Sequence, residues 1–165
     1  MRALILAAIF APVLLTAQPP PATSPPSGVF PEQQGPAVNY AGYAYLDCGS
    51  SNAASIRIVA LQGLVPEGLP KSPPRPSIEF VVSGGLDAVM GKSFTIAAKS
   101  EPGSALAMSC PVVGDCASAE TGNLSITGKA PNGNLLGEFR AKWAIGAPRA
   151  GKFTAFWRDS QAKCG

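Results

Sequence analysis

The clearest pattern in this chain is an alternation of apolar and charged side chains between residues 123 and 158. From Leu135 to Ile145 the odd positions are mostly apolar, and positions 138, 140 and 142 are charged. Successive side chains of a strand point to opposite faces of a sheet, so this segment predicts a half-buried strand. The same alternation predicts further strands over 123–129 and 153–158.

Turn residues separate these three strands. The segment Pro131–Asn134 contains Asn-Gly, a strong hairpin signal because both residues tolerate positive φ. The segment Gly146–Gly151 is a second loop rich in turn residues. We therefore predict a three-stranded antiparallel meander with one apolar face, which a second layer must cover. That face carries Phe139, Trp143, Phe153 and Trp157.

Shorter alternating segments precede the meander, and no segment shows a long helical period. They predict strands over Val38–Cys48, Ser55–Leu61, Ser77–Ser83, Ser93–Ala98 and Ala105–Cys110, with one helical turn over Leu86–Met90. A total of about seven or eight strands favours an all-β fold. We expect an antiparallel β-sandwich, immunoglobulin-like or jelly-roll-like, with a small β-barrel as the alternative.

The first 36 residues differ in composition from the rest. Residues 1–17 combine Arg2, a short apolar run and Ala17 before a polar residue, which is typical of a secretory signal peptide. The alternative is an uncleaved N-terminal anchor, although the run is short and contains Pro12. Residues 18–36 are rich in proline, serine and glutamine and predict a disordered linker. We expect a single folded domain over 37–165 that is secreted or periplasmic, with no transmembrane span after signal cleavage.

Four cysteines in an exported chain predict two disulfides. Cys110 and Cys116 can close a short local loop, which leaves Cys48 to pair with Cys164. The alternative is a metal or redox site, but the chain has no Cys-x-x-Cys spacing and no histidine. We expect no metal and no cofactor.

The absence of histidine also limits catalysis, because it removes Ser-His-Asp and Cys-His mechanisms. Ten carboxylates remain, and a hydrolase needs only two at the right separation. A hydrolase with paired carboxylates is therefore a third hypothesis. It ranks behind the binding domain and the ligand carrier described below, and no catalytic residue is predicted.

Positive charge is concentrated late in the chain. From Lys129 onward there are seven basic residues and only two acidic ones, Glu138 and Asp159, and Arg140, Lys142 and Arg158 share one face of the predicted meander. Such a face can meet an anionic envelope surface, either lipid head groups or an acidic polysaccharide, or an envelope protein. The alternative is a solvated face that keeps the protein soluble. Nucleic acid is not expected, because most aromatic side chains point inward and the chain is exported. The candidate binding residues are Arg140, Lys142, Phe156 and Arg158, with Lys71 and Arg75 of a proline-rich loop as a second candidate.

These features predict an exported non-catalytic domain with a binding or structural role in the cell envelope or extracellular space. The alternative function is a small β-barrel that carries an apolar ligand in its interior. That interior would be lined by Tyr43, Phe80, Phe139, Trp143 and Trp157.

Overall fold

The computed structural model of the chain describes residues 38–48, 52–99, 101, 103–160 and 162–164. The predicted signal peptide (1–17) and linker (18–36) lie outside these residues. No helix in the described part of the chain has the length and apolar character needed to cross a membrane.

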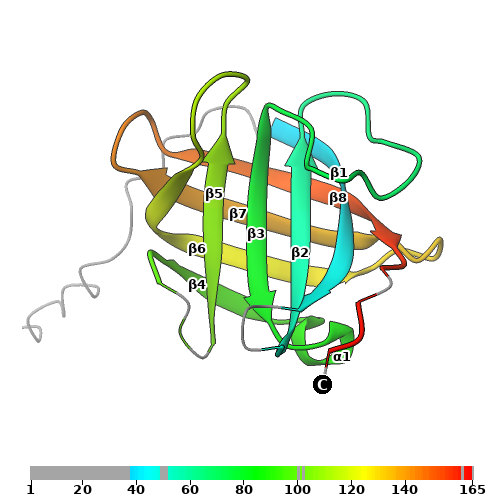
Figure 1. The fold of residues 1–165 in the computed structure, drawn as a ribbon. Coiled ribbons are helices and arrows are strands. Elements are labelled where there is room, and N and C mark those ends of the chain that lie inside the picture. The colour runs from blue at the N-terminus through cyan, green and yellow to red at the C-terminus, as the bar shows by residue number, and fades with distance from the viewer. Residues whose placement is uncertain (1–37, 49–51, 100, 102, 161, 165) are drawn as a thin grey trace, which may run out of the picture. The chain divides into compact units, whose positions relative to one another are not determined.

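The described residues form eight strands and one short helix (Figure 1). The elements are β1 (Val38–Cys48), β2 (Ala54–Leu61), β3 (Ser77–Ser83), α1 (Leu86–Val89), β4 (Ser93–Ala97), β5 (Ser104–Cys110), β6 (Ala117–Lys129), β7 (Leu135–Trp143) and β8 (Arg149–Arg158). The strands join in the order β1-β2-β3-β5-β4-β6-β7-β8 and close into a barrel.

The all-β prediction is confirmed, but the sandwich is not found, and the barrel alternative agrees with the structure. Closure depends on the parallel pairing of β1 with β8, in which Tyr43 lies opposite Phe156 and Tyr45 opposite Arg158. This pairing removes the free edges that two separate sheets would keep. It joins the two ends of the folded domain, and local alternation does not encode such a pairing.

The predicted meander is present as β6, β7 and β8, with antiparallel pairing throughout. Two boundaries differ from the prediction. β6 begins at Ala117 rather than at residue 123, and β8 begins at Arg149, inside the predicted loop. In both places, pairing with a neighbour extends the strand through residues that do not alternate: Ser118 opposes Met108, and Ala150 opposes Arg140.

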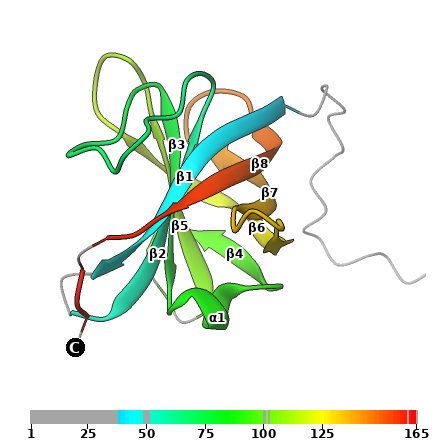
Figure 2. The same ribbon diagram turned by 90° about the vertical axis from the view of Figure 1, so that its right-hand side faces the viewer.

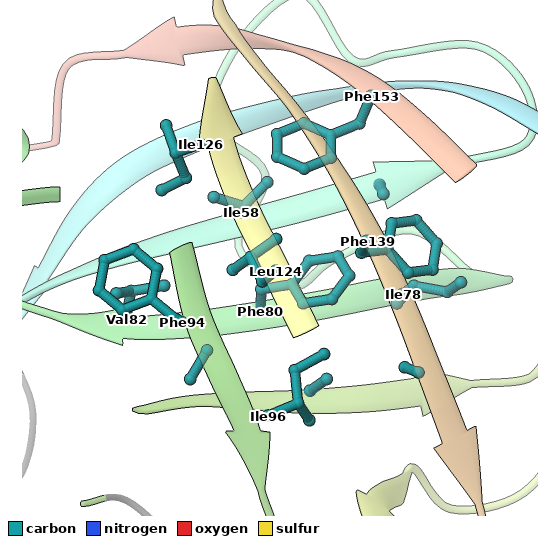
Figure 3. Close-up of a cluster of buried hydrophobic side chains, with 14 of the residues drawn as sticks. Ile58, Ile78, Phe80, Val82, Phe94, Ile96, Leu124, Ile126, Phe139 and Phe153 are labelled. Carbon is teal, nitrogen blue, oxygen red and sulfur yellow. The ribbon is translucent and has the colours of Figure 1, made fainter. Parts of the chain in front are cut away.

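The interior of the barrel is filled by side chains from opposite walls (Figure 3). The Phe80 ring on β3 lies 5.0 Å from the Phe139 ring on β7 and 6.2 Å from the Phe153 ring on β8, between centroids. Ile58 and Leu124 are fully buried in the same cluster. An eight-stranded barrel is just wide enough for side chains to fill it, and here they meet in the middle.

Side chains also pack at both ends of the barrel. At one end α1 places Val89 in the core, with Leu86 and Met90 packed against it. At the other end the Arg149 guanidinium lies 5.7 Å from the Trp143 ring centroid and donates to Ser109 Oγ at 3.2 Å. Arg149 thus bridges β8 and β5 across the barrel mouth.

The two disulfides pair as predicted. Cys48–Cys164 joins the end of β1 to the C-terminal segment, with a sequence separation of 116 residues. Cys110–Cys116 closes the loop that follows β5.

Candidate functional site: the loop end of the barrel

Three loops gather at one end of the barrel, the upper end in Figures 1 and 2. They are residues 62–76, 111–116 and 144–148, which follow β2, β5 and β7. These three strands run in one direction, since each is separated from the next by one antiparallel neighbour. β1 begins at the same end, at Val38. We call this set of loops, with Val38, the loop end.

The loop end holds most of the exposed large apolar side chains. Six of the seven in the described part of the chain lie here: Val38, Leu64, Leu69, Val112, Val113 and Ile145. Three are almost fully in solvent, with exposed fractions of 97% for Leu64, 91% for Ile145 and 85% for Val113. The seventh, Phe156, lies on the barrel wall. Scattered apolar residues are normal on a protein surface, but their concentration at one end makes the loop end a candidate interaction site.

The long loop 62–76 is held against the outside of the barrel by specific contacts. Val65 packs on an outer apolar cluster of Tyr43, Val59 and Leu61. The Arg158 guanidinium donates a hydrogen bond to the Pro66 carbonyl oxygen at 2.9 Å. These contacts fix the segment next to Leu64, so that its exposed side chain is presented from an anchored loop.

A second contact ties two of the loops together. Arg75 of loop 62–76 donates to the Gly114 carbonyl oxygen of loop 111–116 at 2.6 Å. The Cys110–Cys116 disulfide closes the latter loop at its base. Val112 and Val113 are therefore carried on a loop that is crosslinked and braced from outside.

The outer cluster beneath loop 62–76 also perturbs ionisable groups. Burial raises the pKa of Tyr43 above its usual range, and the nearby Tyr45 and Glu79 add to the effect. Burial acts to lower the pKa of Arg57, but a hydrogen bond with Tyr45 and the nearby carboxylates raise it overall. One of those carboxylates is Asp47, whose Oδ2 lies 3.8 Å from Arg57 Nε.

The structure does not gather the predicted basic face into one site. Arg140 and Lys142 lie on β7 close to the loop end, and Arg140 opposes Ala150 of β8. Phe156 lies six residues beyond Ala150 along β8, or about 20 Å at the usual strand rise. Arg158 stands near Phe156, with 5.5 Å between its guanidinium carbon and the ring centroid. The two pairs therefore occupy different ends of the wall.

The second predicted candidate, Lys71 and Arg75, does belong to the loop end. With Lys142 and Arg149 they place four basic side chains there. The carboxylates of Glu67, Asp115 and Glu120 lie on the same loops and on the start of β6. The loop end therefore carries a small positive excess beside its apolar side chains.

The residues predicted to line a ligand-carrying interior divide in a similar way. Phe80, Phe139 and Trp143 are buried in the core, and Trp157 packs against it. Tyr43 lies in the outer cluster instead. Tyr40 and Ala44 of β1 face the interior, so the strand alternation places the odd-numbered Tyr43 outside.

Sequence reasoning missed the apolar loop residues. Leu64, Val112 and Val113 stand in segments rich in glycine and proline, and Ile145 was assigned to the end of a strand. The available signal was an apolar side chain in a turn-rich segment, where neither alternation nor helical period predicts burial.

The structure also shows which carboxylate is unusual. Of the carboxylates in the residues that the structure describes, only Glu79 is buried. It lies with Cys110 and Cys116 in a group whose potential metal-ligand atoms are within 4.8 Å of one another. Both sulfurs are bonded in the disulfide, so neither is a thiolate ligand in this state.

Comparison of the chain with known protein families, curated proteins and solved structures found no match.

Proposed function

We propose that this protein is an exported, non-catalytic binding domain whose loop end docks onto an anionic lipid surface of the cell envelope. The observation that carries the proposal is the gathering of six of seven exposed large apolar side chains on one end of the barrel. Apolar side chains at an interface enter the boundary between head groups and acyl chains, and neighbouring basic residues add attraction to anionic lipid.

The arrangement favours lipid over the other partners considered. An acidic polysaccharide would use Lys71, Lys142 and Arg149 but would leave Leu64 and Ile145 in water. A protein partner would need a surface shaped to fit apolar side chains that come from three separate loops. Separate apolar tips suit a fluid layer, which adapts to each of them.

A carrier of apolar ligands is less well supported by the same structure. Such a carrier needs free volume in the barrel, and the Phe80, Phe139 and Phe153 rings meet across the interior. The helical turn α1 packs against the core at one end of the barrel, and Arg149 lies over the Trp143 ring at the other.

The proposal can be tested by sedimentation with vesicles, using the chain that begins at Gln18. Binding is expected to be stronger to vesicles with phosphatidylglycerol than to pure phosphatidylcholine. A Leu64→Ser, Val113→Ser, Ile145→Ser variant should bind much more weakly, because each inserted side chain contributes about 1.5 kcal/mol, or roughly tenfold in affinity. Lys142→Glu should weaken binding only to the anionic vesicles.

Lys129→Glu is the matched control for Lys142→Glu, since it makes the same change of charge at the end of β6, at the opposite end of the barrel from the loop end. It should weaken binding to anionic vesicles much less than Lys142→Glu does. Equal losses in Lys129→Glu and in Lys142→Glu, or no binding by the wild-type chain, would refute the docking proposal. Recovery of a protein or polysaccharide partner that still binds the triple variant would point to another surface.

A further inference from the structure

The Cys110–Cys116 disulfide lies between two charged side chains. On one side, Glu79 Oε1 is 3.3 Å from Cys110 Sγ. On the other, Arg75 Nη2 is 3.5 Å from Cys116 Sγ. Cys110 and Glu79 are buried, with exposed fractions of 1% and 7%, whereas Cys116 is open to solvent. The two sulfurs thus have opposite surroundings.

The buried side of this site is unsatisfied while the disulfide is intact. A disulfide sulfur carries no proton, so Cys110 cannot donate to the Glu79 carboxylate. Among the described residues, no other group makes a hydrogen bond with the Glu79 side chain, although the Arg57 guanidinium and the Tyr43 hydroxyl lie nearby. Ser77, which lies opposite Cys110 in the sheet, also has a buried Oγ without a partner in the described structure. Buried polar groups without partners are costly, so their presence in one place calls for a role.

Reduction would supply the missing donor. As a free thiol, Cys110 can donate its proton to Glu79 Oε1 over the existing distance. A thiolate at Cys116 would be stabilised by the Arg75 guanidinium beside it. Both charged neighbours therefore suit the reduced state of the pair.

We infer that Cys110–Cys116 is a thiol–disulfide exchange site that reacts with dithiols. Arg75 stabilises the accessible sulfur, and Glu79 carries the proton of the buried one. The chain has no Cys-x-x-Cys spacing, and the sequence therefore does not predict a redox role. The inference depends on the positions of Glu79 and Arg75 alone. It does not depend on the proposed docking to lipid.

The exchange proceeds in two balanced steps. One thiolate of the dithiol attacks Cys116 Sγ, the Cys110–Cys116 bond breaks, and Cys110 leaves with the electron pair. The first thiol of the dithiol has already lost its proton to solvent, and the departing Cys110 sulfur takes up a proton from solvent by way of the Glu79 carboxyl group, which leaves a mixed disulfide at Cys116. The second thiol of the dithiol then loses its proton to solvent, attacks its own partner sulfur in the mixed disulfide and releases Cys116 as a thiolate beside Arg75. Two electrons pass to the protein, and the dithiol departs as a disulfide.

The second disulfide provides an internal control. Cys164 Sγ lies 3.5 Å from the Asp47 carbonyl oxygen, a neighbour without net charge. The full oxidised chain can be treated with dithiothreitol at pH 7, and its free thiols alkylated at intervals and located by peptide mass spectrometry. We expect Cys110–Cys116 to open at least about tenfold faster than Cys48–Cys164, and Glu79→Gln to slow that opening by about tenfold or more. Glu138→Gln, which changes an exposed carboxylate on β7, should leave the rate unchanged.

Two results would overturn the inference. One is the opening of both disulfides at a single rate, which would show that reduction follows unfolding of the domain. The other is a rate in Glu79→Gln that equals that of Glu138→Gln. Should Glu79→Gln fail to fold, Arg75→Gln replaces it. In the reduced protein, this change should shift the alkylation of Cys116 by iodoacetamide to higher pH, and an unchanged pH profile would equally reject the site.

Discussion

The Phe80 ring of β3 lies 5.0 Å from the Phe139 ring of β7, and this contact joins opposite walls of the barrel. β3 and β7 stand four places apart in a ring of eight strands, so their side chains meet only if the interior is filled. The tilt of 55° between the rings is an arrangement that aromatic pairs favour. The interior of the barrel is therefore packed like the core of an ordinary globular domain.

Truncation of one of these rings tests the filled interior. Phe139→Ala should lower the free energy of unfolding by about 3–5 kcal/mol, because it removes buried surface and leaves a cavity. Urea denaturation measures this change, and Phe156→Ala on the wall is the control, with an expected loss below about 1 kcal/mol. A small loss in Phe139→Ala would mean that the interior tolerates empty volume and would favour the carrier hypothesis.

The close approach of strands to aromatic rings gives a second prediction. A methyl group at Gly137 would overlap the Phe153 ring and the Ser125 carbonyl oxygen, so Gly137→Ala should destabilise the fold by about 1–3 kcal/mol. At Gly128 a methyl group would meet no atom of the described structure within 4 Å. Gly128→Ala should therefore be neutral or stabilise by about 0.4–1 kcal/mol, through the lower entropy of the unfolded chain. Equal thermal denaturation midpoints for the two variants would contradict the described packing.

The sequence was sufficient for the parts of the fold that depend on neighbouring residues. β1 and β3 have the predicted bounds, and the inward positions of Phe139, Trp143 and Phe153 follow from alternation alone. The Asn-Gly hairpin lies where expected, and Gly133 has the positive φ that such a turn uses.

The rest depended on contacts between distant residues. Closure needs β1 beside β8, a pairing that no local pattern records. The basic residues share one face in the sequence pattern, but about 20 Å of strand separates Arg140 from Phe156. Glu79 alternates like any exposed strand residue, yet it is buried, with the Cys110 sulfur beside it and Val59 of the outer cluster opposite it on β2. The alternation of apolar and polar residues does not predict that a loop will bury an outward-facing side chain.

The buried hydroxyl of Tyr43 gives a prediction for alkaline pH. Its pKa is raised in the folded state, so the folded chain keeps this proton after the unfolded chain has lost it. The unfolded state then binds fewer protons, and the free energy of unfolding falls as pH rises above about 10, where an ordinary tyrosine ionises. Tyr43→Phe should reduce this fall between pH 10 and 11 while leaving the pH dependence below 9 unchanged. Urea denaturation at each pH tests it, and identical curves for the two proteins would show that the hydroxyl is not held neutral by the fold.

The two disulfides should differ in their contribution to stability. In the chain-entropy model the stabilisation grows with the length of the closed loop, and Cys48–Cys164 spans 116 residues against 6 for Cys110–Cys116. Replacing the first pair by serine should lower the free energy of unfolding by about 4–5 kcal/mol, and replacing the second by roughly 2 kcal/mol. Thermal and urea denaturation of both double variants measures the difference. A larger loss from the short-loop pair would mean that Cys110–Cys116 stabilises the folded loop end itself, and would weigh against its being a readily exchanged bond.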